Sequence, residues 1–287
     1  QNLAGLPADG AISSIIVSPN YTEDHAVLVS TSASGVWKSR DGGDTWASWS
    51  DGLATLNVIR ITASPDYAAD QTVLAATNRG VFLSETAGKL WLPVGPSITT
   101  LSVAISHRDS GEFTAYAGTV AGLYVSEDSG HTWEATSFDS LPVVSIALSP
   151  RFHQDHTLLL GTLGGAYLSN DGGSSWNGPW LEEQAAHCAL FSPNYANDHT
   201  LLLGADEGVY TSQNQGDSWA LAEQAQDTTY VIVASPDYAT APILYAATDH
   251  NGVWASEDGG DTWASRNEGI ASLPLNAVAA SPNYTRD

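Results

Sequence analysis

The sequence has little cysteine, little positive charge and no long apolar run. Cys188 is alone among 287 residues, which excludes an internal disulfide and any metal site built from a cysteine cluster. Nine lysines and arginines face 32 aspartates and glutamates, giving a formal net charge of −23. A chain this acidic would repel phosphate backbones, so we expect no nucleic-acid partner. The longest apolar stretches, such as residues 11–17, are far too short to cross a bilayer, so we expect no membrane insertion.

Methionine is also missing, even from the first position, which is Gln1. A primary translation product begins with methionine, so we expect that processing made this end. Removal of a secretion signal is the favoured interpretation, and a fragment of a longer chain is the alternative. Only 14% of residues are charged, which leaves a polar, sparsely charged surface typical of extracellular proteins. We therefore expect a secreted or cell-surface protein.

An octapeptide that ends in tryptophan recurs six times at intervals of about 43 residues. The copies are SRDGGDTW, SETAGKLW, SEDSGHTW, SNDGGSSW, SQNQGDSW and SEDGGDTW. Their last residues are Trp46, Trp91, Trp133, Trp176, Trp219 and Trp263. A second marker, Ser-Pro followed by an aromatic residue, keeps the same spacing, as at Ser18 and Ser64. Self-similarity at this period indicates one supersecondary unit per repeat.

Each repeat contains four short apolar segments separated by turn residues. In the first repeat these are residues 14–17, 27–31, 35–38 and 45–49. Helical periodicity is missing throughout, so we expect almost no helix. The pattern predicts a six-bladed β-propeller of four-stranded antiparallel blades, as one domain over residues 1–287. Seven blades, or a piece of a longer array, are the alternatives.

The ends of the repeat array do not match. Residues 270–287 form an extra innermost-strand segment, because Asn276–Tyr284 repeats the pattern of Ser13–Tyr21. In a six-bladed ring the two segments compete for one position in the first blade. We expect the spare strand to add to another sheet. Residues 272–287 would then give a head-to-tail homo-oligomer or filament.

The octapeptide resembles the Asp-box, also called the bacterial neuraminidase repeat. Its propeller family includes sialidases, xyloglucan-degrading glycosidases, sortilin-type receptors and photosystem II assembly factors. The resemblance covers nearly the whole chain and implies a propeller. Two copies depart from the pattern: Thr86 and Leu90 replace Asp and Thr in the second, and Asn214 replaces Asp in the fifth. We expect those two turns to be looser.

The carboxylates of the octapeptide, with Asn214 in one copy, are interpreted as structural: Asp41, Asp128, Asp171 and Asp258. They recur once per blade, so they cannot converge on one metal ion or one bond, and no metal site is expected. We expect them to accept hydrogen bonds from their own turns and the following tryptophans to be largely buried. The glycine two residues after each of them indicates a backbone conformation with positive φ.

Residues that break the repeat are the candidates for binding, because function is carried by departures from the scaffold. The fourth repeat holds an irregular stretch with Trp180, Glu182 and Glu183. Three further residues occupy the variable position before the third strand: Arg79, Glu207 and Asn251. Tryptophan beside carboxylates is a composition that suits a sugar.

Catalytic residues cannot be assigned roles in this sequence. The resemblance to sialidases would imply three convergent arginines, but the sequence has only seven arginines and lacks the arginine-bearing motif at its start. We expect a non-enzymatic scaffold, without a cofactor, that binds a protein partner or itself. The alternative is a carbohydrate-binding protein or a glycoside hydrolase of a neutral polysaccharide, which would need two carboxylates about 5–10 Å apart.

Overall fold

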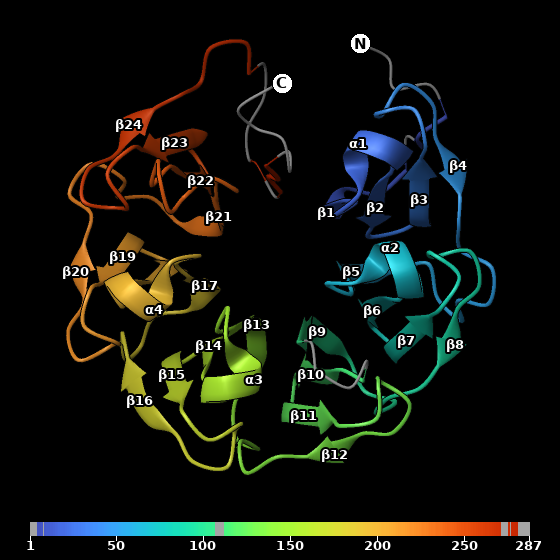
Figure 1. Ribbon diagram of the computed structural model, residues 1–287, viewed down its shortest axis with the longest axis horizontal. Coiled ribbons are helices and arrows are strands. Elements are labelled where there is room, and N and C mark those ends of the chain that lie inside the picture. The colour runs from blue at the N-terminus through green and yellow to red at the C-terminus, as the bar shows by residue number, and fades with distance from the viewer. Residues whose placement is uncertain (1–4, 8, 107–111, 271–274, 276, 281–287) are drawn as a thin grey trace. The chain divides into compact units, whose positions relative to one another are not determined.

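The computed structural model describes residues 5–7, 9–106, 112–270, 275 and 277–280. In that part of the chain, six four-stranded antiparallel sheets each have their strands in chain order (Figure 1). The predicted fold class, a six-bladed β-propeller of four-stranded blades, is confirmed. The chain divides into two compact units, residues 1–142 and 143–287. Three blades lie in each unit, and the single domain over residues 1–287 stays a prediction.

The first unit contains the first three blades. The strands of the first blade are β1 (Ile12–Val17), β2 (Val27–Thr31), β3 (Gly35–Ser39) and β4 (Ala47–Ser48). Those of the second are β5 (Val58–Ala63), β6 (Val73–Thr77), β7 (Gly80–Ser84) and β8 (Leu92–Pro93). Those of the third are β9 (Thr100–Ser106), β10 (Thr114–Thr119), β11 (Gly122–Ser126) and β12 (Glu134–Ala135). The four predicted segments of the first repeat are all strands, and the fourth is shorter than predicted.

The second unit contains the other three blades. The strands of the fourth blade are β13 (Val143–Leu148), β14 (Leu158–Thr162), β15 (Gly165–Ser169) and β16 (Asn177–Trp180). Those of the fifth are β17 (Ala186–Phe191), β18 (Leu201–Ala205), β19 (Gly208–Ser212) and β20 (Ala220–Leu221). Those of the sixth are β21 (Thr229–Ala234), β22 (Leu244–Thr248), β23 (Val253–Ser256) and β24 (Ala264–Ser265).

The core of each unit lies between consecutive blades. In the first unit β1 packs against β5 and β5 against β9; in the second β13 packs against β17 and β17 against β21. One cluster of buried side chains joins Leu28 and Val36 of the first blade to Val73 and Phe82 of the second. Burying such aliphatic and aromatic side chains stabilises the fold by about 1.5–3 kcal/mol each.

Four one-turn helices follow the Ser-Pro markers: α1 (Tyr21–Asp24), α2 (Tyr67–Asp70), α3 (Phe152–Asp155) and α4 (Tyr195–Asp198). The first shows how the marker works. Ser18 Oγ donates to Asp24 Oδ2 at 2.7 Å, and the N–H of Ala26 donates to Asp24 Oδ1 at 2.9 Å. Between them, His25 ends the helix in the left-handed region with φ of 46°. Four residues are too short to show a 3.6-residue period, which is why the sequence pattern did not reveal these helices.

The octapeptide turns close on their own carboxylates. In the first copy, the N–H of Thr45 donates to Asp41 Oδ1 at 2.9 Å, and the N–H of Gly43 donates to Ser39 Oγ at 2.8 Å. Hydrogen bonds from Thr45, the hydroxyl first, lower the pKa of Asp41 to about 2. Gly43 and its five counterparts all have positive φ, as predicted. Asp128, Asp171 and Asp258 accept the same backbone hydrogen bond.

The two divergent turns are each closed by a backbone hydrogen bond as well, and whether they are looser than the others stays a prediction. The N–H of Leu90 donates to Thr86 Oγ1 at 2.9 Å, and the N–H of Ser218 donates to Asn214 Oδ1 at 3.0 Å. A hydroxyl or amide oxygen reaches the same backbone N–H as a carboxylate oxygen, so the turn needs an acceptor but not a charge.

The six octapeptide tryptophans are all buried or half-buried, and they differ in degree. Only Trp91 and Trp263 are buried, with 1% and 4% of their surface exposed. The others are half-buried: Trp46, Trp133, Trp176 and Trp219. Each tryptophan precedes the outermost strand of its blade, so a segment outside that blade must cover it. Trp91 has such a cover, since its Nε1 donates to Trp49 O at 2.9 Å and its N–H to Asp51 O at 2.8 Å.

Candidate functional site

The irregular stretch of the fourth repeat forms the longest outer strand among the described blades. β16 has four residues where its counterparts have two, and its pairing with β15 shifts register between Ala166 and Leu168. Gly178–Pro179 is a cis peptide bond. After the strand, Leu181 and Glu183 adopt positive φ. The irregular sequence of the fourth repeat therefore corresponds to a backbone conformation that differs from that of the other outer strands.

Trp180 is not an exposed aromatic platform. Its side chain is half-buried, its ring centroid lies 6.1 Å from that of Trp219, and it packs against a core cluster of the fourth and fifth blades. Glu182 and Glu183 are exposed in the following turn. Burial raises the pKa of the Tyr167 hydroxyl, and the charge of Glu182 adds to this effect. Trp180 therefore supports the fold, while the two glutamates lie at the surface.

Each of the three predicted hairpin residues makes a contact within its own unit. Glu207 Oε2 accepts a hydrogen bond from Tyr210 OH at 2.9 Å. The backbone N–H of Asn251 donates to Asp227 Oδ2 at 2.7 Å. Arg79 belongs to the first unit, where it is exposed and its N–H donates to Thr77 Oγ1 at 3.0 Å. These contacts stabilise the hairpins between the second and third strands. The binding set predicted from the sequence, which joins these three residues to Trp180, Glu182 and Glu183, stays a prediction.

A cluster of aspartate, histidine and tyrosine, not predicted from the sequence, lies around the neighbouring hairpins of the second unit. His187 Nε2 lies 2.7 Å from Asp206 Oδ1, and the His187 and Tyr230 rings are 5.2 Å apart. Burial alone would raise the pKa of Asp206, but the hydrogen bonds from the Ala185 N–H and from His187 lower it overall. The repeat positions of these residues differ between blades, so no periodic signal marks them.

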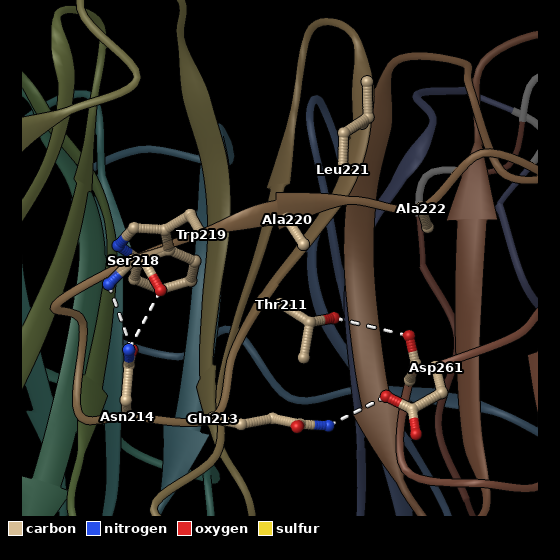
Figure 2. Close-up of a pocket in the computed structure, with 10 residues that line it drawn as sticks. Thr211, Gln213, Asn214, Ser218, Trp219, Ala220, Leu221, Ala222 and Asp261 are labelled. Atoms are coloured by element: carbon tan, nitrogen blue, oxygen red, sulfur yellow. Dashed lines mark hydrogen bonds between the residues drawn. The ribbon is translucent and has the colours of Figure 1, made fainter.

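A cleft of about 380 Å³ lies beside β20, between the fifth and sixth blades (Figure 2). Its lining comes from β19, β20, the segment after β20 and the octapeptide turns of the fifth and sixth blades. The lining residues are Thr211, Gln213, Asn214, Ser218, Trp219, Ala220, Leu221, Ala222, Gly260 and Asp261. Figure 2 shows Gln213 reaching toward Asp261, and its Nε2 donates to Asp261 Oδ1 at 2.8 Å.

The cleft combines hydrogen-bonding groups with an apolar strand edge. Trp219 Nε1 is buried and has no acceptor among the described residues. β20 is the outermost strand of its sheet, and no strand of the described chain pairs with its outer side. Such an edge offers unpaired backbone groups to a ligand. The lining holds one carboxylate, that of Asp261, and the described residues contain no group of three or more potential metal ligands.

Comparison with known proteins shows similarity to one family model and to several solved structures. A family model described as Sortilin-Vps10, "Sortilin, neurotensin receptor 3", matches residues 164–281, which is less than half of the chain. A comparison of the sequence with curated proteins gives no match. The predicted resemblance to propellers of the sortilin type is confirmed.

Solved structures match over nearly the whole chain at low identity. The GH74 xyloglucanase from Xanthomonas campestris matches with a TM-score of 0.75 and 14% identity, over 98% of this chain and 50% of that one. YCF48 bound to a D1 peptide matches with a TM-score of 0.65 and 17% identity, over 90% and 83%. The extracellular domain of BT4673 from B. thetaiotaomicron, named as a one component system, matches with a TM-score of 0.66 and 16% identity. The match covers 88% of this chain and 33% of that one.

At these identities the likeness shows the fold alone. The chain spans half the length of the xyloglucanase chain and a third of the solved BT4673 extracellular domain. No helix in the described residues has the length and hydropathy to cross a membrane.

Proposed function

We propose that this chain is a non-catalytic propeller that binds an extended segment of a partner protein in the cleft beside β20. The observation that carries the proposal is the geometry of that cleft: an unpaired strand edge flanked by a buried indole N–H and by the Gln213–Asp261 pair. Extended peptides add to exposed sheet edges through main-chain hydrogen bonds, and flanking side-chain groups supply specificity. Ala220 is exposed and Leu221 half-buried on this edge, which suits small apolar side chains of a ligand.

The comparisons support a protein ligand by analogy. One structural neighbour, YCF48, holds a D1 peptide, and another is an extracellular domain. We extend both properties to this chain as part of the proposal: a protein partner, and a location outside the cell. The polar, sparsely charged composition agrees with that location.

The test selects binding peptides from a displayed random library and measures their affinity by fluorescence anisotropy. Leu221→Asp places a charge on the β20 edge and should weaken binding at least tenfold. Ala135→Asp is the matched control, because Ala135 is exposed at the same position of the outer strand in the third blade. If both substitutions leave affinity unchanged, or both reduce it equally, the β20 cleft is not the binding site.

Self-association through residues 272–287 stays part of the proposal. β1 pairs with β2, so the N-terminal segment holds the first-strand position of the first blade. Most of residues 272–287 lie outside the described residues, and Leu275 and 277–280 have no regular secondary structure. Deleting 272–287 should abolish oligomers detected by mass photometry. Oligomers that persist in the truncated protein would exclude strand exchange through this segment.

A further inference from the structure

Both lysines of the chain line one cavity in the first unit. Lys38 and Lys89 face a cavity of about 690 Å³ between the first and second blades, together with Arg40. Trp49 and Tyr67 form its aromatic wall, and Asn20, Gln71 and Thr86 add polar groups. Three of the nine basic residues of a chain with net charge −23 therefore meet at one site. Such focusing of positive charge attracts anions locally despite the negative net charge.

Lys38 is buried without a carboxylate partner. Only 6% of its surface is exposed, and its Nζ donates to Tyr67 OH at 2.8 Å and to Ala87 O at 3.3 Å. The Nζ also lies 4.3 Å from the centroid of the Trp49 ring. The other third strands place neutral residues here: Leu83, Val125, Leu168, Thr211 and Ala255. Burial, and then the charge of Arg40, lower the pKa of Lys38 to about 8, against a smaller opposing effect of the Asp24 carboxylate.

The two outer cations occupy positions that form complementary pairs at other blade junctions. The second residue of one octapeptide faces the sixth residue of the next. Gln213 donates to Asp261 at 2.8 Å, and His131 Nε2 lies 3.9 Å from Glu85 Oε1. At the first junction the corresponding residues are Arg40 and Lys89, which repel each other. In the described chain, neither of them nor Lys38 has a carboxylate oxygen within 4 Å.

Sequence changes have also removed negative charge from this cavity. Thr86 stands where four other octapeptides have aspartate, and Lys89 stands where three have aspartate. Asp24 is the one carboxylate among the lining residues, and both of its oxygens already accept hydrogen bonds from Ser18 Oγ and the Ala26 N–H. An anion placed between the three cations would supply the missing counter-charge.

We propose that the cavity between the first and second blades binds a small oxyanion, held by Lys38, Arg40 and Lys89. The guanidinium and the two ammonium groups donate charge-assisted hydrogen bonds to carboxylate, sulfate or phosphate oxygens. Asn20 and Gln71 are placed to contact a polar body attached to that group. The site is separate from the cleft beside β20 and takes a ligand of different chemistry.

The experiment uses the small number of lysines. With lysine labelled at the ε-carbon, NMR of the whole chain gives two side-chain signals, which a Lys89→Gln variant assigns. Sulfate, phosphate and glucuronate are each titrated at constant ionic strength against chloride. We expect saturable shifts of both signals with at least one anion. For sulfate and glucuronate, whose charge is constant in this range, affinity should rise as pH falls from about 9 to 7, because the anion binds the ammonium form of Lys38.

Variants separate a built site from general charge screening. Arg40→Gln and Lys89→Gln each remove one exposed charge and should weaken binding at least tenfold. Lys89→Asp should abolish binding, because the new carboxylate pairs with Arg40. Arg151→Gln, an exposed arginine of the second unit, removes the same charge and should have no effect.

The three probes also identify the anion class. Saturation by glucuronate alone assigns a carboxylate site, saturation by sulfate and phosphate alone assigns a tetrahedral oxyanion site, and saturation by all three leaves a general oxyanion site. Shifts that are linear in anion concentration, or equal in the Arg151→Gln and Lys89→Gln variants, would overturn the proposal.

Discussion

Replacing Trp91 by alanine should destabilise the first unit more than the same change at Trp133. Trp91 is 1% exposed and loses a 2.9 Å hydrogen bond from its indole to Trp49 O. Removing a buried tryptophan costs about 3–5 kcal/mol, and the lost hydrogen bond adds about 1 kcal/mol. Trp133 is half-buried, and its indole also donates a 2.9 Å hydrogen bond, to Gly130 O. We therefore expect a smaller cost at Trp133, and the difference comes from burial and not from the hydrogen bond.

Urea unfolding measured by far-UV circular dichroism checks this difference. Both residues belong to the same compact unit, so the two variants report on one structural context. We expect an unchanged m value and a larger midpoint shift for Trp91→Ala than for Trp133→Ala. Equal shifts would refute the argument that a segment of the preceding blade, rather than the octapeptide itself, determines how well each tryptophan is buried.

Two further predictions concern carboxylates. The turn holds the pKa of Asp128 at about 2, chiefly through the Thr132 hydroxyl, so its contribution to stability is present above its unfolded value near 4 and is lost as pH falls toward 2. Asp128→Asn should therefore flatten the fall in melting temperature between about pH 4 and 2, and an unchanged slope would contradict this. We also expect no hydrolysis of a sialoside or β-glucan; activity that disappears in Glu182→Gln or Glu183→Gln would show that the chain is a glycosidase.

The blade structure could be predicted from the sequence because its signals are local and repeated. The octapeptide and the Ser-Pro marker each define a turn whose donors and acceptors lie within about six residues, as in the Ser18–Asp24 contact. Whether Thr86 and Asn214 keep a turn closed depends on acceptor geometry, which residue identity alone does not give. The burial of Trp91 depends on a segment about 40 residues earlier, so the period could not distinguish it from Trp133.

The candidate sites were harder to predict because they form between repeats. The irregular stretch at Trp180 can be recognised in the sequence. Whether Trp180 packs in the fold or binds a ligand depends on its contact with Trp219, which the sequence does not show. The proximity of Arg40 to Lys89 could be predicted only by knowing that the second residue of one octapeptide turn faces the sixth residue of the next. That relation can be read from the sequence only after one structure, here through Gln213 and Asp261, has shown it.

This facing relation also constrains how such a chain can be rearranged. A duplicated or transplanted blade brings its own second and sixth octapeptide residues to new neighbouring blades. The charges of the two facing residues then decide whether the new junction is attractive, neutral or repulsive. Inserting the first blade ahead of a blade with aspartate at the sixth position, like Asp261, would place Arg40 beside a carboxylate. Blade order can thus be designed, and a ligand site created or erased, by surface substitutions that leave every buried side chain in place.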